Sequence, residues 1–256
     1  MLVSTASSSA SAAARPTAVH DLGNGVTTTF PYEPYPCQLD FMRAVVSSLD
    51  SKRVGLLESP TGTGKTLCLL CAATAWQAAR RADGTLPPGG AQIVYASRTH
   101  SQLSQVAKEM KKAGVAATCA TLGSREQLCV HERVSQLRGA RQNAACSTLV
   151  GARACGYRNK LTQTPALADT AAPPVADIEE VAKAGRAAGI CPYYASRDRS
   201  ATADVVLAPY VCVALRRCCD CSTPPHAPLR PRQIPLRPAV PQDHARRVGG
   251  RRGHLR

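Results

Sequence analysis

Apolar residues recur every three or four positions in two stretches of the chain, 39–49 and 101–112, which predicts one amphipathic helix for each stretch. Their apolar faces consist of Phe41, Val45, Leu49, Leu103, Val106 and Met110. A third stretch, 67–76, is apolar almost throughout and predicts a buried helix. Gly114 follows the second amphipathic stretch, at the place where glycine commonly ends a helix.

Short runs rich in apolar or β-branched residues alternate with these helices and predict strands. The runs occupy residues 22–30 (a turn, then a strand), 54–58 and 93–96 (both expected to be buried) and 204–210. Connections rich in proline or glycine lie at 31–38 and 83–90. Because strands alternate with helices, we expect an α/β fold with a parallel, doubly wound sheet and helices on both faces.

The sequence Ser-Pro-Thr-Gly-Thr-Gly-Lys-Thr lies between the strand predicted at 54–58 and the helix predicted at 67–76. A glycine loop in this position is the context of a Walker A phosphate-binding loop, and it favours that interpretation over a glycine-rich turn with a chance Gly-Lys-Thr. Backbone N–H groups at the helix N-terminus would surround an anion. Lys65 is expected to reach the β- and γ-phosphates of a nucleotide, and the Thr66 hydroxyl is expected to bind Mg²⁺.

The predicted nucleotide-binding residues of this loop are Ser59, Pro60, Thr61, Gly62, Thr63, Gly64, Lys65 and Thr66, with Lys65 and Thr66 as the catalytic residues. Ser59 stands where the motif usually has its first glycine. That position contributes its backbone, so a small residue should serve there. The loop therefore predicts binding of a nucleoside triphosphate.

Composition narrows the class of protein. A length of 256 residues predicts one or two domains, and 44% apolar residues suffice for a core. The sequence contains no run of about 18 apolar residues, so it predicts no membrane-spanning helix. Residues 1–20 are rich in Ser and Ala, which favours a disordered low-complexity extension over a transit peptide. Without a secretory signal, the twelve cysteines indicate metal or cluster ligands, or core thiols, in a reducing compartment.

Positive charge is concentrated at the end of the chain. The net charge is +15, and residues 211–256 hold ten Arg and no Lys against two Asp. This segment also has seven Pro and no Phe, Trp or Tyr, which predicts disorder. It would suit a basic arm that binds nucleic acid. A frame change or a retained intron is the interpretation we favour.

Five motifs, in this order, resemble the N-terminal part of the iron–sulfur DNA helicases related to xeroderma pigmentosum group D. They are Phe30–Gln38, Leu57–Leu70, Tyr95–Leu103, Leu122–Cys129 and Cys191–Tyr194. The resemblance covers residues 21–210, about three-quarters of the chain. It implies a RecA-like domain of a superfamily 2 helicase that hydrolyses ATP with Mg²⁺ and moves 5′→3′ on single-stranded or forked DNA. It also implies a nuclear protein of DNA repair and telomere maintenance; protein partners are not implied.

The resemblance assigns roles to residues outside the phosphate loop. It implies that Gln38 contacts the adenine and that Ser97, Arg98 and Thr99 track the backbone of single-stranded DNA. Arg98 and Thr99 are also residue types that contact phosphates, and they follow a strand, where open α/β sheets bind ligands. The residues alone leave a second interpretation open, in which this segment only ends the strand and caps the next helix.

The cysteines of the first 210 residues have different expected roles. Cys68 and Cys71 form a C-x-x-C pair, but they lie in the apolar helix at 67–76, which favours inert core thiols over a redox pair. Four others, Cys129, Cys146, Cys155 and Cys191, are separated by 17, 9 and 36 residues. These spacings lack the close pairs typical of structural zinc. The resemblance implies that the four hold a 4Fe–4S cluster; zinc and no metal are the alternatives.

The expected organisation has five parts. They are an extension (1–20), the first part of the ATP-binding domain (21–118), an iron–sulfur insert (119–195), a return strand (196–210) and the tail (211–256). Within the insert, 177–183 predicts a solvated helix with acids in its first turn.

The family resembled continues after an Ala-Pro-Tyr sequence with an Asp-Glu-Ala-His motif, whose acids hold Mg²⁺ and position the attacking water. In this chain the acids beyond Asp204 are only Asp220 and Asp243, so we expect neither that motif nor a second RecA-like domain here. Two functions follow. The chain is the front part of an ATP-dependent DNA helicase that cannot turn over ATP by itself, or it is a non-catalytic product that binds nucleotide and DNA.

Overall fold

The computed structural model describes residues 18–87 and 90–211. The predicted extension at 1–20 and the predicted tail at 211–256 lie outside the described residues, except for residues 18–20 and 211. No helix within the described ranges is both long and apolar enough to cross a bilayer.

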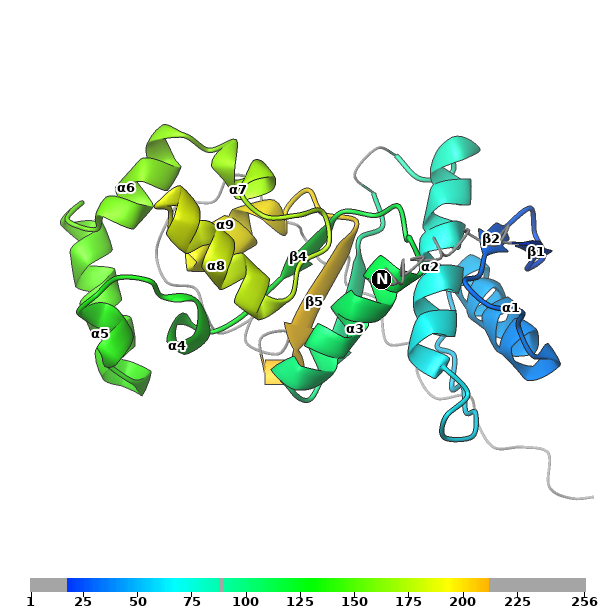
Figure 1. The fold of residues 1–256 in the computed structure, drawn as a ribbon. Coiled ribbons are helices and arrows are strands. Elements are labelled where there is room, and N and C mark those ends of the chain that lie inside the picture. Colours follow the sequence, from blue (N-terminus) through cyan, green and yellow to red (C-terminus); the bar gives the residue numbers. More distant parts are fainter. Residues whose placement is uncertain (1–17, 88–89, 212–256) are drawn as a thin grey trace, which may run out of the picture. The chain divides into compact units, whose positions relative to one another are not determined.

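Figure 1 shows the elements in chain order. The strands are β1 (Val19–Asp21), β2 (Thr27–Thr29), β3 (Ile93–Ser97), β4 (Cys119–Thr121) and β5 (Val205–Pro209). The longer helices are α1 (Pro36–Asp50), α2 (Lys65–Ala82), α3 (His100–Lys112), α5 (Gly139–Gly151) and α8 (Ile178–Ala188). The shorter helices are α4 (Arg125–Leu128), the 3₁₀ turn η1 (Val134–Gln136), α6 (Gly156–Gln163), α7 (Leu167–Thr170) and α9 (Pro192–Arg199).

The main sheet is parallel, as the alternation of strands and helices predicted. Its strand order is β3-β5-β4, with Ile93 and Cys119 both in register with Val205. The strand β5 confirms the prediction at 204–210, and all five of its residues are buried. Alternate side chains of a strand point to opposite faces. Accordingly, Val205 and Leu207 pack with α2 and α3, while Val206 and Ala208 pack in a second cluster.

One predicted strand is wrong. Residues 54–58 form no strand, and the side chains of Val54 and Leu56 are 100% and 99% exposed. β-branched and apolar residues favour a strand only where neighbouring strands supply hydrogen bonds and a packed surface. Among the described residues, no strand pairs with this segment. For the same reason β3 is only partly buried, contrary to expectation. It pairs with β5 alone within the described sheet, and Val94 is 46% exposed.

The first two long helices share a core with the N-terminal hairpin. Strands β1 and β2 are antiparallel and are joined by a turn in which Gly23 and Gly25 have φ of +87° and +73°. The buried members of this core come from the hairpin, α1 and α2. They are Leu22, Val26, Phe30, Met42, Val45, Val46, Leu67, Cys68, Cys71 and Ala72. The predicted helix at 67–76 is therefore confirmed, and it extends to Ala82.

Both amphipathic helices are confirmed. Helix α1 begins at Pro36, three residues before the predicted stretch, because proline suits the first helical position. In α3 the predicted face of Leu103, Val106 and Met110 is buried against the sheet. Gly114 follows with φ of +61°, the left-handed conformation that ends a helix.

Helices α4 to α9 lie between β4 and β5 in the sequence, and α6, α7 and α9 share a small core with the residue that follows the α8 C-cap. Its buried residues are Leu161, Ala168, Ile190 and Ala195. Helix α8 confirms the helix predicted near 177–183. Asp177 caps its N-terminus, and Glu179 and Glu180 lie in its first turn. Glu180 accepts a hydrogen bond from Lys111 at 2.5 Å, which ties α8 to α3.

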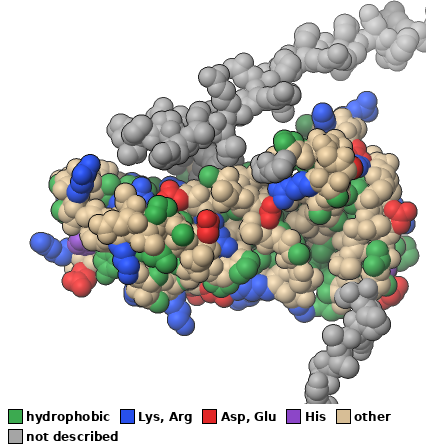
Figure 2. All heavy atoms as spheres, turned by 90° about the horizontal axis from the view of Figure 1, so that it is seen from above, with side chains coloured by type: hydrophobic (Ala, Val, Ile, Leu, Met, Phe, Trp, Pro, Cys, Tyr) green, Lys and Arg blue, Asp and Glu red, His purple; other side chains and the backbone are tan. Residues whose placement is uncertain are grey.

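Figure 2 shows one face of the molecule, on which Lys and Arg side chains are interspersed with Asp and Glu. Opposite charges that alternate over a surface cancel at distances beyond the Debye length, which is about 8 Å at physiological salt. Net charge on this face therefore does not mark a track for nucleic acid. Any nucleic-acid site on this face would depend on particular residues.

Candidate nucleotide site and cysteine cavity

The phosphate loop is positioned by α2, which begins at Lys65 directly after the two glycines. Gly62 and Gly64 have φ of +82° and +69°, a conformation that residues with a Cβ rarely adopt. The Lys65 ammonium donates hydrogen bonds to the carbonyl oxygens of Ser59 and Pro60, at 2.7 Å each. The Lys65 side chain therefore folds back over its own loop.

Ser59 contributes its side chain as well as its backbone. Its hydroxyl lies 2.6 Å from the hydroxyl of Thr63. The Thr63 hydroxyl also donates to the carbonyl oxygen of Pro60 at 2.9 Å. A glycine at position 59 could not make the first of these contacts, so the serine stabilises the closed turn of this loop.

Gln38 connects α1 to the phosphate loop. Its Oε1 accepts from the backbone N–H of Tyr35 at 2.8 Å, and its Nε2 donates to the carbonyl oxygen of Thr63 at 2.9 Å. The first bond is part of a capping box at the start of α1. Sequence reasoning had associated Gln38 with a bound base, and it missed this contact with the loop.

An open cavity of about 430 Å³ lies at the N-terminus of α2. It is lined by Phe30, Tyr32, Gln38, Gly62, Gly64, Lys65, Thr66, Leu67, Gln105 and Glu109. Its size falls in the range of small-molecule sites. Five of the predicted nucleotide-binding residues thus line one cavity, whereas Ser59, Pro60, Thr61 and Thr63 belong to the same loop but do not line it.

Sequence reasoning missed the other walls of this cavity. Phe30 and Tyr32 follow β2, and Gln105 and Glu109 come from α3. The Lys112 ammonium lies 5.0 Å from the centre of the Tyr32 ring, which holds this exposed aromatic ring at the cavity. The two aromatic residues so close to Gln38 were a usable signal. The α3 residues had none, because only folding brings that helix to the loop.

The segment Ser97–Arg98–Thr99 lies at the carboxyl end of β3. The Thr99 side chain accepts from the backbone N–H of Gln102 at 3.3 Å and caps α3. The Ser97 hydroxyl donates to the Gln102 side chain at 2.7 Å. Both hydroxyls are therefore used in ending the strand and starting the helix, while Arg98 is exposed.

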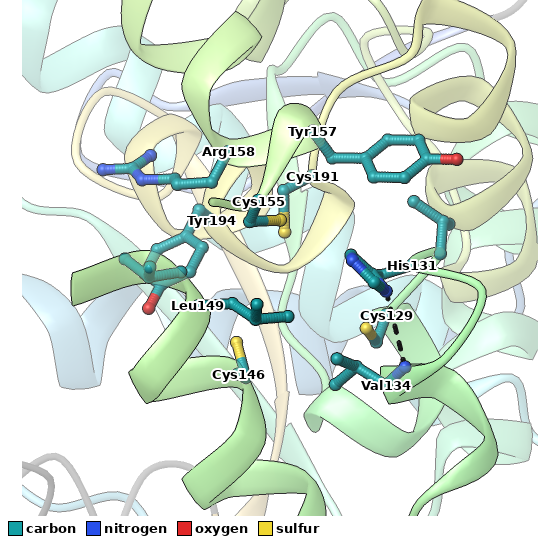
Figure 3. Close-up of a pocket in the computed structure, with 12 residues that line it drawn as sticks. Cys129, His131, Val134, Cys146, Leu149, Cys155, Tyr157, Arg158, Cys191 and Tyr194 are labelled. Atoms are coloured by element: carbon teal, nitrogen blue, oxygen red, sulfur yellow. Dashed lines mark hydrogen bonds between the residues drawn. The ribbon is translucent and has the colours of Figure 1, made fainter. Parts of the chain in front are cut away.

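Four cysteines that are far apart in the sequence line one cavity, shown in Figure 3. Cys146 lies within α5, and Cys129 directly follows α4. Cys155 and Cys191 are the N-cap residues of α6 and α9. A helix N-terminus carries partial positive charge, which favours a thiolate over a thiol. The fold therefore directs two helix N-termini at this cavity.

Burial opposes ionisation of two of these thiols, Cys129 and Cys191. Loss of hydration raises the pKa of Cys129, and it raises that of Cys191 to about 11. Backbone N–H groups act in the opposite direction, that of His131 on Cys129 and those of Tyr193 and Tyr194 on Cys191. Because these donors only partly offset burial, thiolates here require a bound cationic group.

The donor set fits such a group. All four cysteines are free thiols, and thiolates suit zinc or an iron–sulfur cluster. No set of three or more His, Cys, Asp or Glu among the described residues converges closely enough to hold a single metal ion. The open space is only about 20 Å³, close to the room that one water molecule needs. A larger group would therefore require the side chains around it to move outward.

The remaining buried cysteines, Cys68, Cys71 and Cys119, lie in hydrophobic cores. Burial raises the pKa of Cys68 to about 11 and that of Cys71 to about 12. Both lie on α2 in the core shared with the hairpin. Cys119, on β4, has a pKa raised to about 12 by burial. Cys68 and Cys71 pack among apolar side chains and do not line the four-cysteine cavity, which agrees with their expected inert role.

Comparison with known proteins agrees with the motifs. The family model DEAD_2 matches residues 95–222, half of the chain. The regulator of telomere elongation helicase 1 homolog of Oryza sativa subsp. japonica is 41% identical over 226 residues, which cover 73% of this chain and 22% of that protein. The homolog of Arabidopsis thaliana is 42% identical over 217 residues, with coverages of 73% and 20%. Regulator of telomere elongation helicase 1 of Mus musculus is 40% identical over 221 residues, with coverages of 73% and 18%.

The chain thus spans about a fifth of the length of these curated relatives. The matched family model covers the last three residues of β3, all of β4 and β5, and all the helices that carry the four cavity cysteines. The resemblance predicted from the motifs is confirmed: the chain belongs to the DEAD_2 family of helicases and is similar to the N-terminal part of the regulators of telomere elongation helicase 1.

Proposed function

We propose that this chain is the ATP-binding part of an ATP-dependent DNA helicase that moves 5′→3′ on single-stranded or forked DNA. The helicase would be a nuclear protein and would act in DNA repair and telomere maintenance. The observation that carries the proposal is the cavity at the N-terminus of α2, where Lys65, Thr66 and Gln38 meet. Residues 21–118 and 196–210 would form the RecA-like domain and 119–195 the iron–sulfur insert, except that Cys119–Thr121 is strand β4 of the main sheet and belongs with the former.

Binding of ATP would require Lys65 to change partners. Its ammonium now satisfies two loop carbonyls at 2.7 Å, and a β- or γ-phosphate would offer a charged acceptor instead. A phosphate oxygen carries a full negative charge, whereas a carbonyl oxygen carries only a partial one, so the exchange strengthens the Coulombic attraction on the ammonium. Thr66, in the first turn of α2, would hold Mg²⁺ with its hydroxyl. The backbone N–H groups that begin α2 would bind the phosphates.

The base would lie against the aromatic side of the same cavity. Gln38 uses one amide hydrogen on the loop, and its amide group keeps a second donor for adenine. A base bound by Gln38 would therefore be coupled to the loop carbonyl of Thr63. Through this contact, occupancy of the base site and the conformation of the phosphate loop would influence each other.

Single-stranded DNA would pass the carboxyl edge of the parallel sheet. Arg98 is exposed there, beside the capped start of α3. Because the hydroxyls of Ser97 and Thr99 are engaged with Gln102, Arg98 would supply the phosphate contact and the two hydroxyl residues would fix its position.

The four cavity cysteines would hold a 4Fe–4S cluster, with zinc as the alternative. The thiols surround one cavity without converging on a single point. Tetrahedral zinc requires four sulfurs at about 2.3 Å from one ion, whereas a cluster spreads its ligands over several irons. When bound, such a cluster would cross-link α4, α5, α6 and α9, of which only α6 and α9 contribute to the small core of this region.

A second function rests on the few acids that follow Asp204 in this polypeptide. The acids beyond Asp204 are Asp220 and Asp243, and neither is followed by glutamate. A 256-residue polypeptide that binds nucleotide and DNA without turnover would compete with a complete helicase for its substrate. In that case, binding of ATP would be weak, and hydrolysis would stay at background because no acid would position the attacking water.

Binding of a fluorescent ATP analogue to the 256-residue chain tests the nucleotide site. Lys65→Ala should abolish binding, whereas Lys52→Ala, a lysine outside the cavity, should leave it unchanged. Equal binding by both variants would overturn the proposed site. ATP turnover that is lost in Lys65→Ala would instead refute the non-catalytic function.

A further inference from the structure

His131 belongs to the cysteine cavity but has no role in the proposed ligand set. It follows Cys129 by two residues, and its half-buried imidazole lines the cavity together with all four cysteines. Figure 3 shows the ring between Cys129 on one side and Cys155 and Cys191 on the other. Any group held by these thiols would therefore lie next to the imidazole.

Two backbone hydrogen bonds fix the orientation of this ring. The Nδ1 atom of His131 accepts from the backbone N–H of Arg133 at 3.3 Å and from that of Val134 at 3.4 Å. A backbone amide nitrogen can only donate, so Nδ1 must be the nitrogen without a hydrogen. The neutral imidazole then carries its hydrogen on Nε2.

The Nε2 atom is directed into the cavity. In Figure 3 one ring nitrogen faces Val134, and the other points toward the sulfur atoms of Cys155 and Cys191. Tyr157 meets the imidazole edge to face, with ring centres 6.4 Å apart and planes at 64°. The backbone contacts and this aromatic contact together hold an N–H donor toward the thiols.

We propose that His131 is a positioning residue that donates an Nε2–H hydrogen bond to a sulfur atom of the bound group and thereby raises its reduction potential. The proposal rests on the proposed 4Fe–4S cluster. Reduction adds negative charge to a cluster, and a hydrogen bond to sulfur stabilises that charge. The imidazole would act while neutral and without ligating iron, since the four cysteines already supply the ligands.

The test is a redox titration of anaerobically purified 256-residue protein, followed by EPR of the reduced cluster. In His131→Phe the donor is lost while the ring remains, and we expect the reduced-to-oxidised ratio at a fixed potential to fall about tenfold. For a one-electron couple this corresponds to about 59 mV. His131→Gln keeps an N–H donor at the ε position and should recover most of the ratio. Tyr157→Phe, a change in the same cavity that removes only a hydroxyl, should leave it unchanged.

Iron content separates failure of this inference from failure of the proposed cluster. Full iron in all variants with an unchanged potential in His131→Phe would overturn the role of His131 and leave the cluster intact. Wild-type protein without iron would refute the cluster, and the inference with it. If His131→Phe loses iron, pulsed EPR of wild-type protein with ¹⁵N-labelled histidine decides. A weak ¹⁵N coupling supports an imidazole that is hydrogen-bonded to the cluster. A strong coupling, as expected from an iron ligand, contradicts the inference, and so does the absence of any coupling.

Discussion

Replacement of Asp204 by alanine should reveal how the parallel sheet is held to α2. Asp204 directly precedes β5, and its side chain is 19% exposed. Its carboxylate forms an ion pair with Arg81 of α2 and accepts two hydrogen bonds of 2.8 Å from Thr118, one from the backbone N–H and one from the hydroxyl. It therefore joins α2, the start of β4 and the start of β5.

The expected cost follows from these three contacts. A hydrogen bond to a charged group is worth about 1.5–3 kcal/mol, and breaking a fully buried pair costs about 3–5 kcal/mol. Because Arg81 is 30% exposed, water will recover part of that cost. We expect Asp204→Ala to lower the free energy of unfolding by about 2–3 kcal/mol. Asp40→Ala is the matched control. Its ion pair with Arg43 is exposed, and its loss should cost at most about 0.5 kcal/mol.

Urea unfolding, followed by circular dichroism, measures both variants. Asp204→Ala should lower the midpoint without changing the slope, which reports the area exposed on unfolding. Although burial alone would raise it, the pKa of Asp204 lies below its ordinary value because of Arg81 and Thr118. A lowered folded pKa stabilises the fold above the unfolded value of 3.8, and this contribution is lost as pH falls through the folded pKa. The difference between wild type and variant should therefore shrink below about pH 4. A loss at pH 7 no larger than that of Asp40→Ala would refute this reasoning.

Three further outcomes are expected. Gln38→Ala should lower the free energy of unfolding, measured in urea, by about 1 kcal/mol because it removes the cap of α1. It should also weaken nucleotide binding in titrations because it removes the contact with the loop; an unchanged affinity for nucleotide would contradict the proposed coupling. Replacing any one of the four cavity cysteines by serine should lower the iron content in metal analysis, whereas Cys68→Ser should not; iron loss in both would point to general unfolding. Arg98→Ala should reduce the salt slope of single-stranded DNA binding by about 0.7, as expected for one lost phosphate contact, and truncation after Tyr210 should reduce it further; an unaltered slope for Arg98→Ala would exclude that contact.

Local chemistry was sufficient where an element is specified by its own residues. The helical spacing of Leu103, Val106 and Met110 predicted α3, and the apolar run that ends at Tyr210 predicted β5. In each case the pattern repeats within a few residues, so it does not depend on what the rest of the chain supplies.

Prediction failed where a segment depends on its neighbours. Residues 54–58 have the composition of a buried strand, but a strand is stable only beside a partner, and none pairs with them among the described residues. The short strand β4 escaped notice for the opposite reason. Cys119–Thr121 is too short to show a pattern, and it is fixed by pairing with β5.

The sequence by itself determined the class of fold, the phosphate loop and, through its motifs, the family. Only the tertiary structure decided which residues share a site. Gln105 and Glu109 reach the cavity at the N-terminus of α2 because α3 packs against the sheet beside α2, and His131 faces the sulfur atoms because the backbone after α4 fixes its ring. The four cysteines between residues 129 and 191 line one cavity because packing brings distant segments of the chain together, and no local pattern encodes that packing.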